Sequence, residues 1–293
     1  MNQNEVWRAV ETEIGSGFRI DRRVACSGGS INSAMRIEGA TGAFFVKLND
    51  ASLLRMFDAE VQGLREIAAT GAIRIPEPVA SGIGGGQAFL VLELLNLRSS
   101  TPKSNAKLGE QLALMHKCLG TAFGWSIDNT IGSTLQRNTA TGDWIGFWMQ
   151  HRFLFQLDLA QRNGCSGRLI ENGRRLSEGL ADFFQGHTPV PSLLHGDLWA
   201  GNAAADDTGS PVIFDPACYF GDRETDVAMT ELFGGFGTEF YRAYAQVWPL
   251  DPGYRVRKVL YNLYHVLNHF NLFGGGYQQQ AGTMIKSLLA ELG

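Results

Sequence analysis

The stretch LHGDLWAGN at residues 194–202, followed by VIFDP at residues 212–216, is the densest chemical signal in this 293-residue chain. It places Asp197 five positions before Asn202, and it places Asp215 directly after an apolar run. Glycines at two positions of the first stretch allow the backbone to turn tightly. The two stretches therefore predict a polar loop and a strand end that meet at one site.

These residue types fit the needs of phosphoryl transfer, in which negative charge spreads over the moving phosphoryl group. A carboxylate must orient the acceptor hydroxyl and take its proton, and we predict that Asp197 does this. Mg²⁺ favours oxygen ligands and keeps several waters, so Asn202 and Asp215 are sufficient as its protein ligands. The pattern is that of a kinase catalytic loop with His-Gly-Asp in place of His-Arg-Asp. One aspartate in a glycine-rich loop is more often a turn residue, but the whole pattern favours catalysis.

Lys47 lies within an apolar strand, where alternation places it on the same face as Phe45. An ammonium group at such a position needs a partner or a cleft. We predict Glu60, on the following helix, as the partner, because a Lys–Glu pair holds the amine against nucleotide phosphates. Asp58 and Glu66 on the same helix are rival partners, and an exposed lysine on a solvated face is the simpler alternative.

Two further segments are candidates for nucleotide binding. Gly28, Gly29 and Ser30 lie between the first two predicted strands and could offer backbone N–H groups to phosphates, although a simple hairpin turn explains them equally well. Residues 92–94 (Leu92, Glu93 and Leu94) end the last predicted strand of the sheet, where their backbone could bond an adenine edge. Any buried strand looks the same, so this second signal is weak by itself.

Hydrophobic periodicity predicts two lobes with a cleft between them. In the first lobe we expect a helix over 6–14, strands over 18–24, 34–38 and 43–48, a helix over 50–70, and strands over 79–83 and 87–92. After that the chain becomes mainly helical, with helices expected around 108–115, 144–155 and 167–184 and from 225 onward. The layout predicts an α+β fold: a small N-terminal lobe over residues 1–95, with an antiparallel sheet plus helix, and a larger helical lobe over 96–293.

Composition argues against several classes of protein. With 25 Lys+Arg and 29 Asp+Glu, the net charge of −4 does not suit a chain that coats nucleic acid or an anionic membrane. No apolar run approaches the roughly 18 residues needed to span a bilayer. The first residues lack the basic and apolar regions of a secretory signal, and the four cysteines form no CxxC pair. We therefore expect a cytoplasmic protein with reduced thiols.

At this point the sequence resembles the fructosamine/ketosamine kinase family, within the aminoglycoside-phosphotransferase-like branch of the protein-kinase fold. The resemblance covers nearly the whole chain. His-Gly-Asp with its Asn and Asp marks only the wider branch, which includes choline and homoserine kinases. The narrower match rests on the motifs GGSI at 28–31, FFVK at 44–47, FGW at 123–125, DN at 128–129, IGST at 131–134, and DPACY with GDRE at 215–224.

The resemblance implies ATP- and Mg²⁺-dependent phosphorylation of a sugar hydroxyl, at O3 of a ketosamine such as ribulosamine or fructosamine, free or on protein lysines. It implies Asp197 as proton acceptor, Asn202 and Asp215 as magnesium ligands, Lys47 as phosphate anchor and residues 92–94 as the adenine hinge. The oligomeric state stays open.

The substrate pocket is less well defined by the sequence. Trp199 could wall the sugar site, since aromatic rings stack on sugars, or it could belong to the core. Asp222, Glu224 and Asp226 could bond the substrate or cap the next helix, and capping is favoured for at least one of them. Three polar residues on a late helix, His265, Asn268 and His269, are expected to be structural.

Two alternatives remain from the residues alone. One is a kinase of another hydroxylated amine, such as an aminoglycoside, choline or homoserine, because acidic residues near the site suit any cationic acceptor. The other is a pseudokinase that binds nucleotide without turnover. Retention of Asp197 together with the metal ligands argues against the second alternative, since a binding module has no need of a base.

Overall fold

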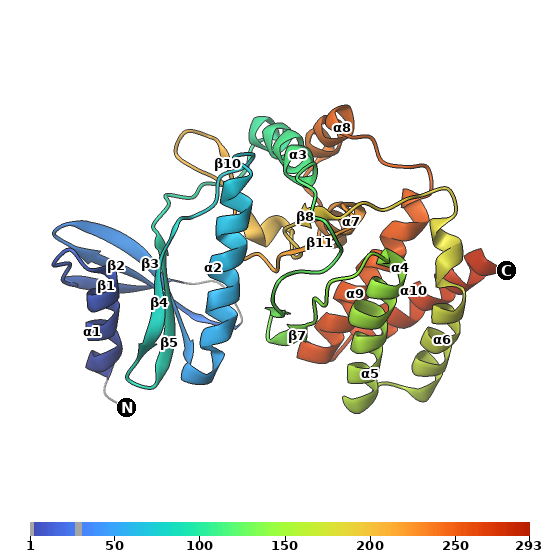
Figure 1. Cartoon of the computed structure of the whole chain (residues 1–293), viewed down its shortest axis with the longest axis horizontal. Coiled ribbons are helices and arrows are strands. Elements are labelled where there is room, and N and C mark those ends of the chain that lie inside the picture. The colour runs from blue at the N-terminus through green and yellow to red at the C-terminus, as the bar shows by residue number, and fades with distance from the viewer. Residues whose placement is uncertain (1–2, 27–30) are drawn as a thin grey trace.

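A five-stranded antiparallel sheet forms the first lobe, with its strands side by side in the order β1-β2-β3-β5-β4. The computed structural model describes residues 3–26 and 31–293, and this lobe lies at the left of Figure 1 with the N-terminus. A tight hairpin joins β2 and β3, with Gly39 opposite Gly42. The bounds of the elements in this lobe are α1 Gln3–Ile14, β1 Arg22–Cys26, β2 Ser33–Gly39, β3 Gly42–Asp50, α2 Leu54–Ala69, β4 Pro78–Gly84 and β5 Gln87–Glu93.

The two faces of β3 contact different parts of the molecule, which confirms the predicted alternation. Val46 belongs to a small apolar core together with Val10 of α1. On the opposite face, Phe45 packs against the main core, and Lys47 lines the cleft between the lobes. The strand therefore presents a lysine to the cleft while its other face stabilises the sheet.

The predicted strand over 18–24 is wrong at its start, because β1 begins only at Arg22. Phe18 is buried, but it reaches the small core from a loop, where its ring meets that of Phe44 edge-on at 5.1 Å between centroids. Gly17, at φ +72°, turns the chain just before this point. An apolar residue thus fills the core here without joining the strand ladder.

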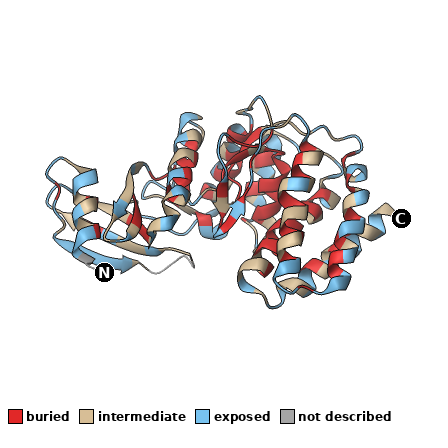
Figure 2. Ribbon diagram, turned by 60° about the horizontal axis from the view of Figure 1, so that its bottom comes forward, coloured by how far each residue is buried: buried red, intermediate tan, exposed pale blue. Residues whose placement is uncertain are grey.

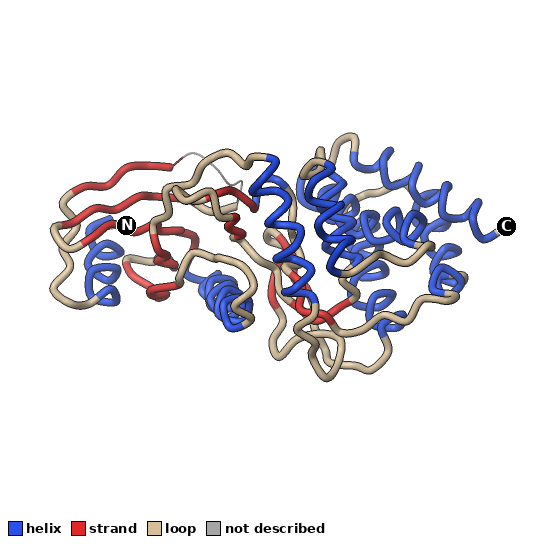
Figure 3. The backbone as a smooth tube through the Cα atoms, turned by 90° about the horizontal axis from the view of Figure 1, so that it is seen from above, coloured by secondary structure: helices blue, strands red, loops and turns tan. Residues whose placement is uncertain are grey.

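The second lobe is mainly helical, so the predicted α+β architecture of two unequal lobes is confirmed (Figures 1 and 3). Buried residues concentrate where its helices face one another (Figure 2). The helices are α3 Pro102–His116, α4 Trp144–Trp148, α5 Phe155–Arg162, α6 Gly167–Glu178, α7 Glu224–Leu232, α8 Thr238–Val247, α9 Tyr254–Phe273 and α10 Tyr277–Leu292. Three small antiparallel sheets pair β6 Asn129–Ile131 with β7 Thr134–Gln136, β8 Ser192–Leu194 with β11 Tyr219–Gly221, and β9 Ala203–Ala205 with β10 Pro211–Ile213.

Two helices predicted as continuous are interrupted. The aromatic helix over 144–155 contains a π-helical stretch, Met149–Leu154, in which the buried guanidinium of Arg152 lies 4.1 Å from the ring centroid of Tyr219. The helix over 167–184 ends at Glu178, and a 3₁₀ turn follows. Gly179 sits at that break, where a Cβ would come within 2.7 Å of Leu292, so close packing against α10 occupies the space of a side chain.

The two chemical stretches of the sequence follow two short strands of the second lobe. Residues 195–202 come directly after β8, and Asp215 comes shortly after β10. The predicted lobe boundary after residue 95 falls in the segment between β5 and α3. Within the described ranges, none of the helices combines the length and the apolarity that a membrane-spanning helix requires.

Candidate active site

A cleft of about 1040 Å³ lies between the lobes, and it collects most of the predicted site residues. Asp197 and Asp215, which are far apart from Lys47 in the sequence, line the same cavity as that lysine. The predicted residues that line it are Lys47, Glu60, Leu92, Glu93, Leu94, Asp197, Trp199, Asn202 and Asp215. Its volume lies at the upper end of the usual range for ligand pockets, so two substrates have room side by side.

The turn into residues 195–202, the predicted catalytic loop, is held by a buried carboxylate on α7. Asp226 accepts hydrogen bonds from the backbone amides of His195, at 2.7 Å, and Gly196, at 2.8 Å. Gly196 has φ +81°, and a Cβ there would lie 2.1 Å from the carbonyl oxygen of Ala217. Only glycine fits this close approach, which explains the central residue of the His-Gly-Asp motif.

Asp226 is itself held by a buried chain of hydrogen bonds. Its carboxylate contacts Nε2 of His116 at 3.2 Å, and Nδ1 of the same ring bonds the hydroxyl of Tyr244 at 2.8 Å. Burial would raise the pKa of Asp226, but the bond from His116 and the nearby amides outweigh it and lower the pKa. The carboxylate therefore stays ionised as an anchor for the loop.

The catalytic loop and the Asp215 segment are tied to each other by hydrogen bonds. The Nε2 of His195 donates to the Phe214 carbonyl at 3.0 Å, and the Ala217 amide donates to the His195 carbonyl at 2.8 Å. The Phe214 amide in turn bonds the carbonyl of Asn202 at 3.1 Å. These bonds fix the two stretches as one unit, as the sequence pattern required.

Asn202 and Asp197 are in direct contact. The amide nitrogen of Asn202 donates to the backbone carbonyl of Asp197 at 2.8 Å and to its Oδ2 at 3.3 Å. Both bonds use the nitrogen and leave the amide oxygen as a ligand for a cation. Burial raises the pKa of Asp197 to about 7, and repulsion from Asp215 and Asp226 adds to this effect. A carboxylate with this pKa is a stronger base than an ordinary aspartate.

Lys47 bridges two carboxylates from different elements. Its Nζ lies 2.6 Å from Glu60 on α2 and 2.6 Å from Asp215 in the second lobe. Burial by itself would lower the pKa of Lys47, but these two carboxylates outweigh it and raise the pKa above its ordinary value. The rival partners are engaged elsewhere: Asp58 accepts from Ser81, and Glu66 accepts from the indole of Trp125.

Asp215 adopts a backbone conformation that is rare for a residue with a side chain. Its φ is +59°, in the left-handed region, which aspartate tolerates better than most residues. With one oxygen bonded to Lys47, the half-exposed carboxylate keeps its second oxygen for a cation. An amide oxygen and a carboxylate on one wall of the cleft are the donor set that a hard cation such as Mg²⁺ prefers.

The hinge segment lines the cleft, but its groups are not equally available. The Glu93 amide donates to the Glu77 carbonyl at 2.8 Å, and the Glu93 carboxylate is held by Arg74 at 2.6 Å. Leu94, just beyond the end of β5, is therefore the better placed of the predicted hinge residues for a nucleotide base. Gly28, Gly29 and Ser30 lie outside the described residues.

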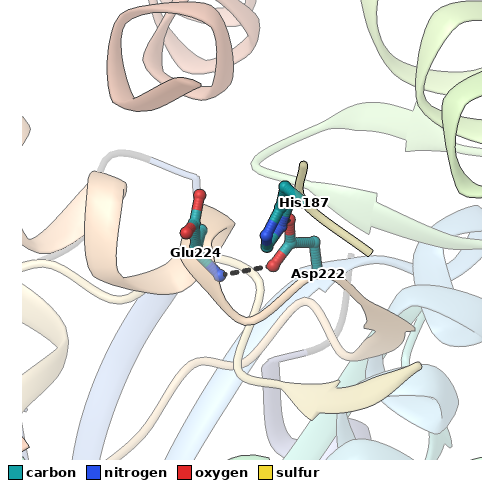
Figure 4. Close-up of side chains that lie close together, drawn as sticks. All are labelled: His187, Asp222 and Glu224. Carbon is teal, nitrogen blue, oxygen red and sulfur yellow. Dashed lines mark hydrogen bonds and ion pairs between the residues drawn. The ribbon is translucent and has the colours of Figure 1, made fainter. Parts of the chain in front are cut away.

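Asp222 and Glu224, predicted as possible substrate ligands, are not among the described residues that line the cleft. They lie beside His187 instead (Figure 4). Both are buried in a cluster with His187. Asp222 accepts from His187 at 2.7 Å, from the Tyr261 hydroxyl at 2.6 Å and from the backbone amide of Glu224 at 3.0 Å. The last bond satisfies the amide of the first residue of α7, next to the cap residue Arg223.

The same cluster has the right residue types for a metal, but its oxygens are already used. Both oxygens of Glu224 accept from Arg257, at 2.7 and 3.0 Å. His187 bonds Asp222 through Nε2 and Asp251 through Nδ1. Hydrogen bonds and ion pairs thus satisfy the donors and acceptors, and the cluster stabilises the fold.

The sequence interpretation missed several residues of the cleft. Asn268 and His269, expected to be structural, both line it, as does Thr130 in the β6–β7 hairpin. Phe233, which follows α7, lies 6.0 Å from Trp199 between ring centroids. Helical periodicity marks such residues only as one face of a helix, and it does not show whether a core or a cavity covers that face.

Comparison with known proteins finds relatives that match nearly the whole chain. The family model described as fructosamine kinase matches residues 2–291. A probable ketoamine kinase of Synechocystis is 46% identical over 297 residues, with 99% of each chain covered. A chloroplastic protein-ribulosamine 3-kinase of rice is 42% identical over 295 residues, covering 100% of this chain and 85% of the relative.

Solved structures extend the comparison to the fold. A putative fructosamine-3-kinase from Haemophilus somnus superposes with a TM-score of 0.89 at 30% identity, covering 98% of this chain and 97% of the other. An aminoglycoside phosphotransferase in a ternary complex with ADP and hygromycin B has a TM-score of 0.64 at 15% identity, with 96% and 98% covered. At that identity the second likeness shows the fold alone.

Proposed function

This chain belongs to the fructosamine kinase family, and from that premise we propose that it transfers the γ-phosphoryl group of Mg·ATP to the O3 hydroxyl of a ketosamine. The observation that carries the proposal is the convergence of Asp197, Asn202, Asp215 and Lys47 on one cleft. Each of these groups answers a separate need of phosphoryl transfer to an alcohol.

Asp197 is the proposed proton acceptor. A ketosamine hydroxyl within hydrogen-bond reach of its carboxylate is oriented for attack and loses its proton to that oxygen. The raised pKa makes the carboxylate basic enough to take the proton, and the bond from Asn202 keeps it in one orientation. Asp226 has an indirect role, because it holds the loop that carries Asp197.

Lys47 is the proposed phosphate anchor. The Glu60 carboxylate holds its ammonium group in the cleft, where it would bond the phosphate oxygens of the nucleotide. Asn202 and Asp215 are the residues that would hold Mg²⁺. When bound, the cation would offset the charge on the β- and γ-phosphates.

A ketosamine acceptor is favoured by the relatives. Proteins named ketoamine kinase or protein-ribulosamine 3-kinase match this chain over nearly its full length at 40–46% identity. Aminoglycoside phosphotransferases share the fold at 13–16% identity, which carries no argument about the acceptor. We infer a ribulosamine or fructosamine, with its amine either small or part of a lysine.

The test is ADP release by the purified chain with ribuloselysine, fructoselysine, choline, homoserine and an aminoglycoside. Turnover of the ketosamines alone supports the proposal, and phosphate on O3 is identified by NMR of the product. Turnover of another acceptor in preference to the ketosamines refutes the assignment of substrate. No turnover with any acceptor, together with tight ATP binding, supports a pseudokinase.

A further inference from the structure

Five aromatic side chains form a continuous wall along one part of the cleft. Ring centroids are 6.0 Å apart between Trp199 and Phe233, and 4.9 Å apart between Phe233 and His269. From His269 the distances are 5.7 Å to Phe273 and 5.2 Å to Tyr277. All five residues line the cleft, and they come from the catalytic loop, the end of α7, α9 and the start of α10. We name these five residues the aromatic wall.

None of the five side chains of the aromatic wall is an acid, a lysine or an arginine. The Nδ1 of His269 donates to the backbone carbonyl of His265 at 2.8 Å, so the lone pair of the neutral ring is on Nε2. Burial lowers the pKa of His269. Among the described residues that line the cleft, formal charges are carried elsewhere, by Lys47, Glu60, Glu93, Asp197 and Asp215.

We propose that the aromatic wall binds the protonated amine of the ketosamine and the first carbons of its substituent, by cation–π and apolar contact. The inference rests on the proposed function, which places the reacting hydroxyl at Asp197. In a ketosamine only C1, C2 and C3 separate the amine from O3, so the amine must lie close to that carboxylate. Trp199, two residues after Asp197, begins the wall at this place.

The chemistry of the wall suits the amine better than the sugar. A secondary ammonium group is attracted to the negative faces of aromatic rings, and it can donate a hydrogen bond to the free Nε2 of His269. An aromatic ring can stack on the C–H face of a sugar, but the hydroxyls of the sugar chain also need several donors and acceptors, and the carbon faces of the wall do not offer them.

The aromatic wall is more exposed at two of its residues, so a substituent on the amine can reach solvent there. Trp199 is 38% exposed and Phe273 is 52% exposed, whereas the other three rings are only partly exposed. A chain attached to the amine can therefore run along the rings toward solvent. This arrangement favours amines whose first carbons are aliphatic, such as a lysine side chain, and disfavours a carboxylate next to the nitrogen.

The experiment measures binding rather than turnover. Isothermal titration calorimetry of the full chain, with a non-hydrolysable ATP analogue and Mg²⁺ present, compares fructosyl-butylamine with its neutral N-acetyl derivative. We expect the wild type to bind the cationic compound about 5- to 20-fold more tightly, the range that a desolvated cation–π contact supports. A third ligand, fructosyl-glycine, should bind more weakly than fructosyl-butylamine because of its carboxylate.

Variants test whether the preference for the cationic compound over its neutral derivative depends on the aromatic wall. Phe233→Leu and Tyr277→Leu keep apolar volume but remove a ring face, so each should reduce the preference for the cationic compound toward 1 without changing the affinity for the nucleotide. Phe155→Leu is the matched control, because Phe155 is a half-buried aromatic residue on α5 that does not line the cleft. This control should keep the preference of the wild type.

The outcomes separate this inference from the proposed function. No binding of the cationic compound, no preference for it in the wild type, or an unchanged preference in both leucine variants overturns the aromatic wall as an amine site. Ketosamine turnover without any preference removes the inference and leaves the kinase activity. A preference that depends on Phe233, found without any turnover, supports the amine site and removes the activity.

Discussion

The ammonium group of Lys47 lies 2.6 Å from the carboxylate of Asp215, so a strand of the first lobe is joined to the segment of the second lobe that follows β10. The same ammonium group contacts Glu60 on α2. The ammonium group therefore joins the sheet, α2 and the Asp215 segment at one point. A nucleotide phosphate would compete with Glu60 and Asp215 for Lys47, and a metal ion would compete with Lys47 for Asp215. The contacts of Lys47 are therefore the ones that we expect to change when a ligand binds.

Replacement of the proposed base should separate chemistry from binding. In Asp197→Asn the side chain keeps its shape but can no longer accept a proton, so kcat should fall by about 10²- to 10⁴-fold. The Kd for ATP, measured by calorimetry, should change little, because Lys47 and Glu60 are untouched. Activity close to that of the wild type would remove the proposed mechanism.

Replacement of Glu60, the partner of Lys47, should weaken the binding of the nucleotide and not that of the ketosamine. Glu60→Gln removes a buried charge-assisted bond, so the KM for ATP should rise about 10-fold while the KM for the ketosamine stays nearly constant. Asp58→Asn, on the same helix, is the matched control, because that carboxylate contacts Ser81 instead. Equal effects of the two variants would contradict the assignment of Glu60.

Asp226 should matter for catalysis without touching a substrate. Asp226→Asn keeps one acceptor oxygen for two backbone amides, so we expect the catalytic loop to shift and kcat to fall about 10- to 100-fold. The KM for ATP should remain close to that of the wild type. A fall in thermal stability with kcat unchanged would show that this carboxylate only stabilises the fold.

Glu224 provides the contrasting case on the same helix. Glu224→Gln leaves the buried Arg257 without its charged partner, which costs about 3 kcal/mol of unfolding free energy. Because Glu224 lies outside the cleft lining, the KM for the ketosamine should not change at temperatures where the variant is folded. Chemical denaturation and steady-state kinetics measure the two effects, and a raised KM without a loss of stability would restore Glu224 as a substrate ligand.

The raised pKa of His187 predicts how the free energy of unfolding depends on pH. Burial alone would lower the pKa of His187, but its bond to Asp222 outweighs this and raises it. Because the pKa of His187 is higher in the folded than in the unfolded protein, protonated His187 stabilises the fold. This stabilisation is complete below the unfolded pKa of about 6.5, and it is lost as the pH rises through the folded pKa.

A comparison of the wild type with His187→Gln tests the direction in which the contribution of His187 to stability changes with pH. The difference in unfolding free energy between the two proteins should be largest near pH 5.5 and should shrink as the pH rises to 9. Denaturation with urea at several pH values measures it. A difference that grows with pH would show that the imidazole is neutral in the folded protein at every pH tested.

Local sequence patterns were sufficient for the parts of the site that lie close together in the chain. His195, Asp197 and Asn202 belong to one loop, and Asp215 follows the next apolar run, so their spacing and residue types carried the prediction. Lys47 and Glu60 were also predictable, because strand alternation and helix position each limit where a charged side chain can point. Boundaries were less predictable, as Phe18 shows, because an apolar residue fills a core equally well from a loop.

The sequence by itself determined the two-lobed α+β architecture through its periodicity, and it predicted the loop of Asp197 and Asn202 through residue types at short spacing. It indicated the family through motifs that resemble those of known members. Only the tertiary structure decided which acids face the cleft. Asp222 and Glu224 turn to His187 and Arg257, while Phe233 and His269 meet beside Trp199. The physical reason is that burial and partnership depend on the packing of elements distant in the chain, and no local pattern contains that information.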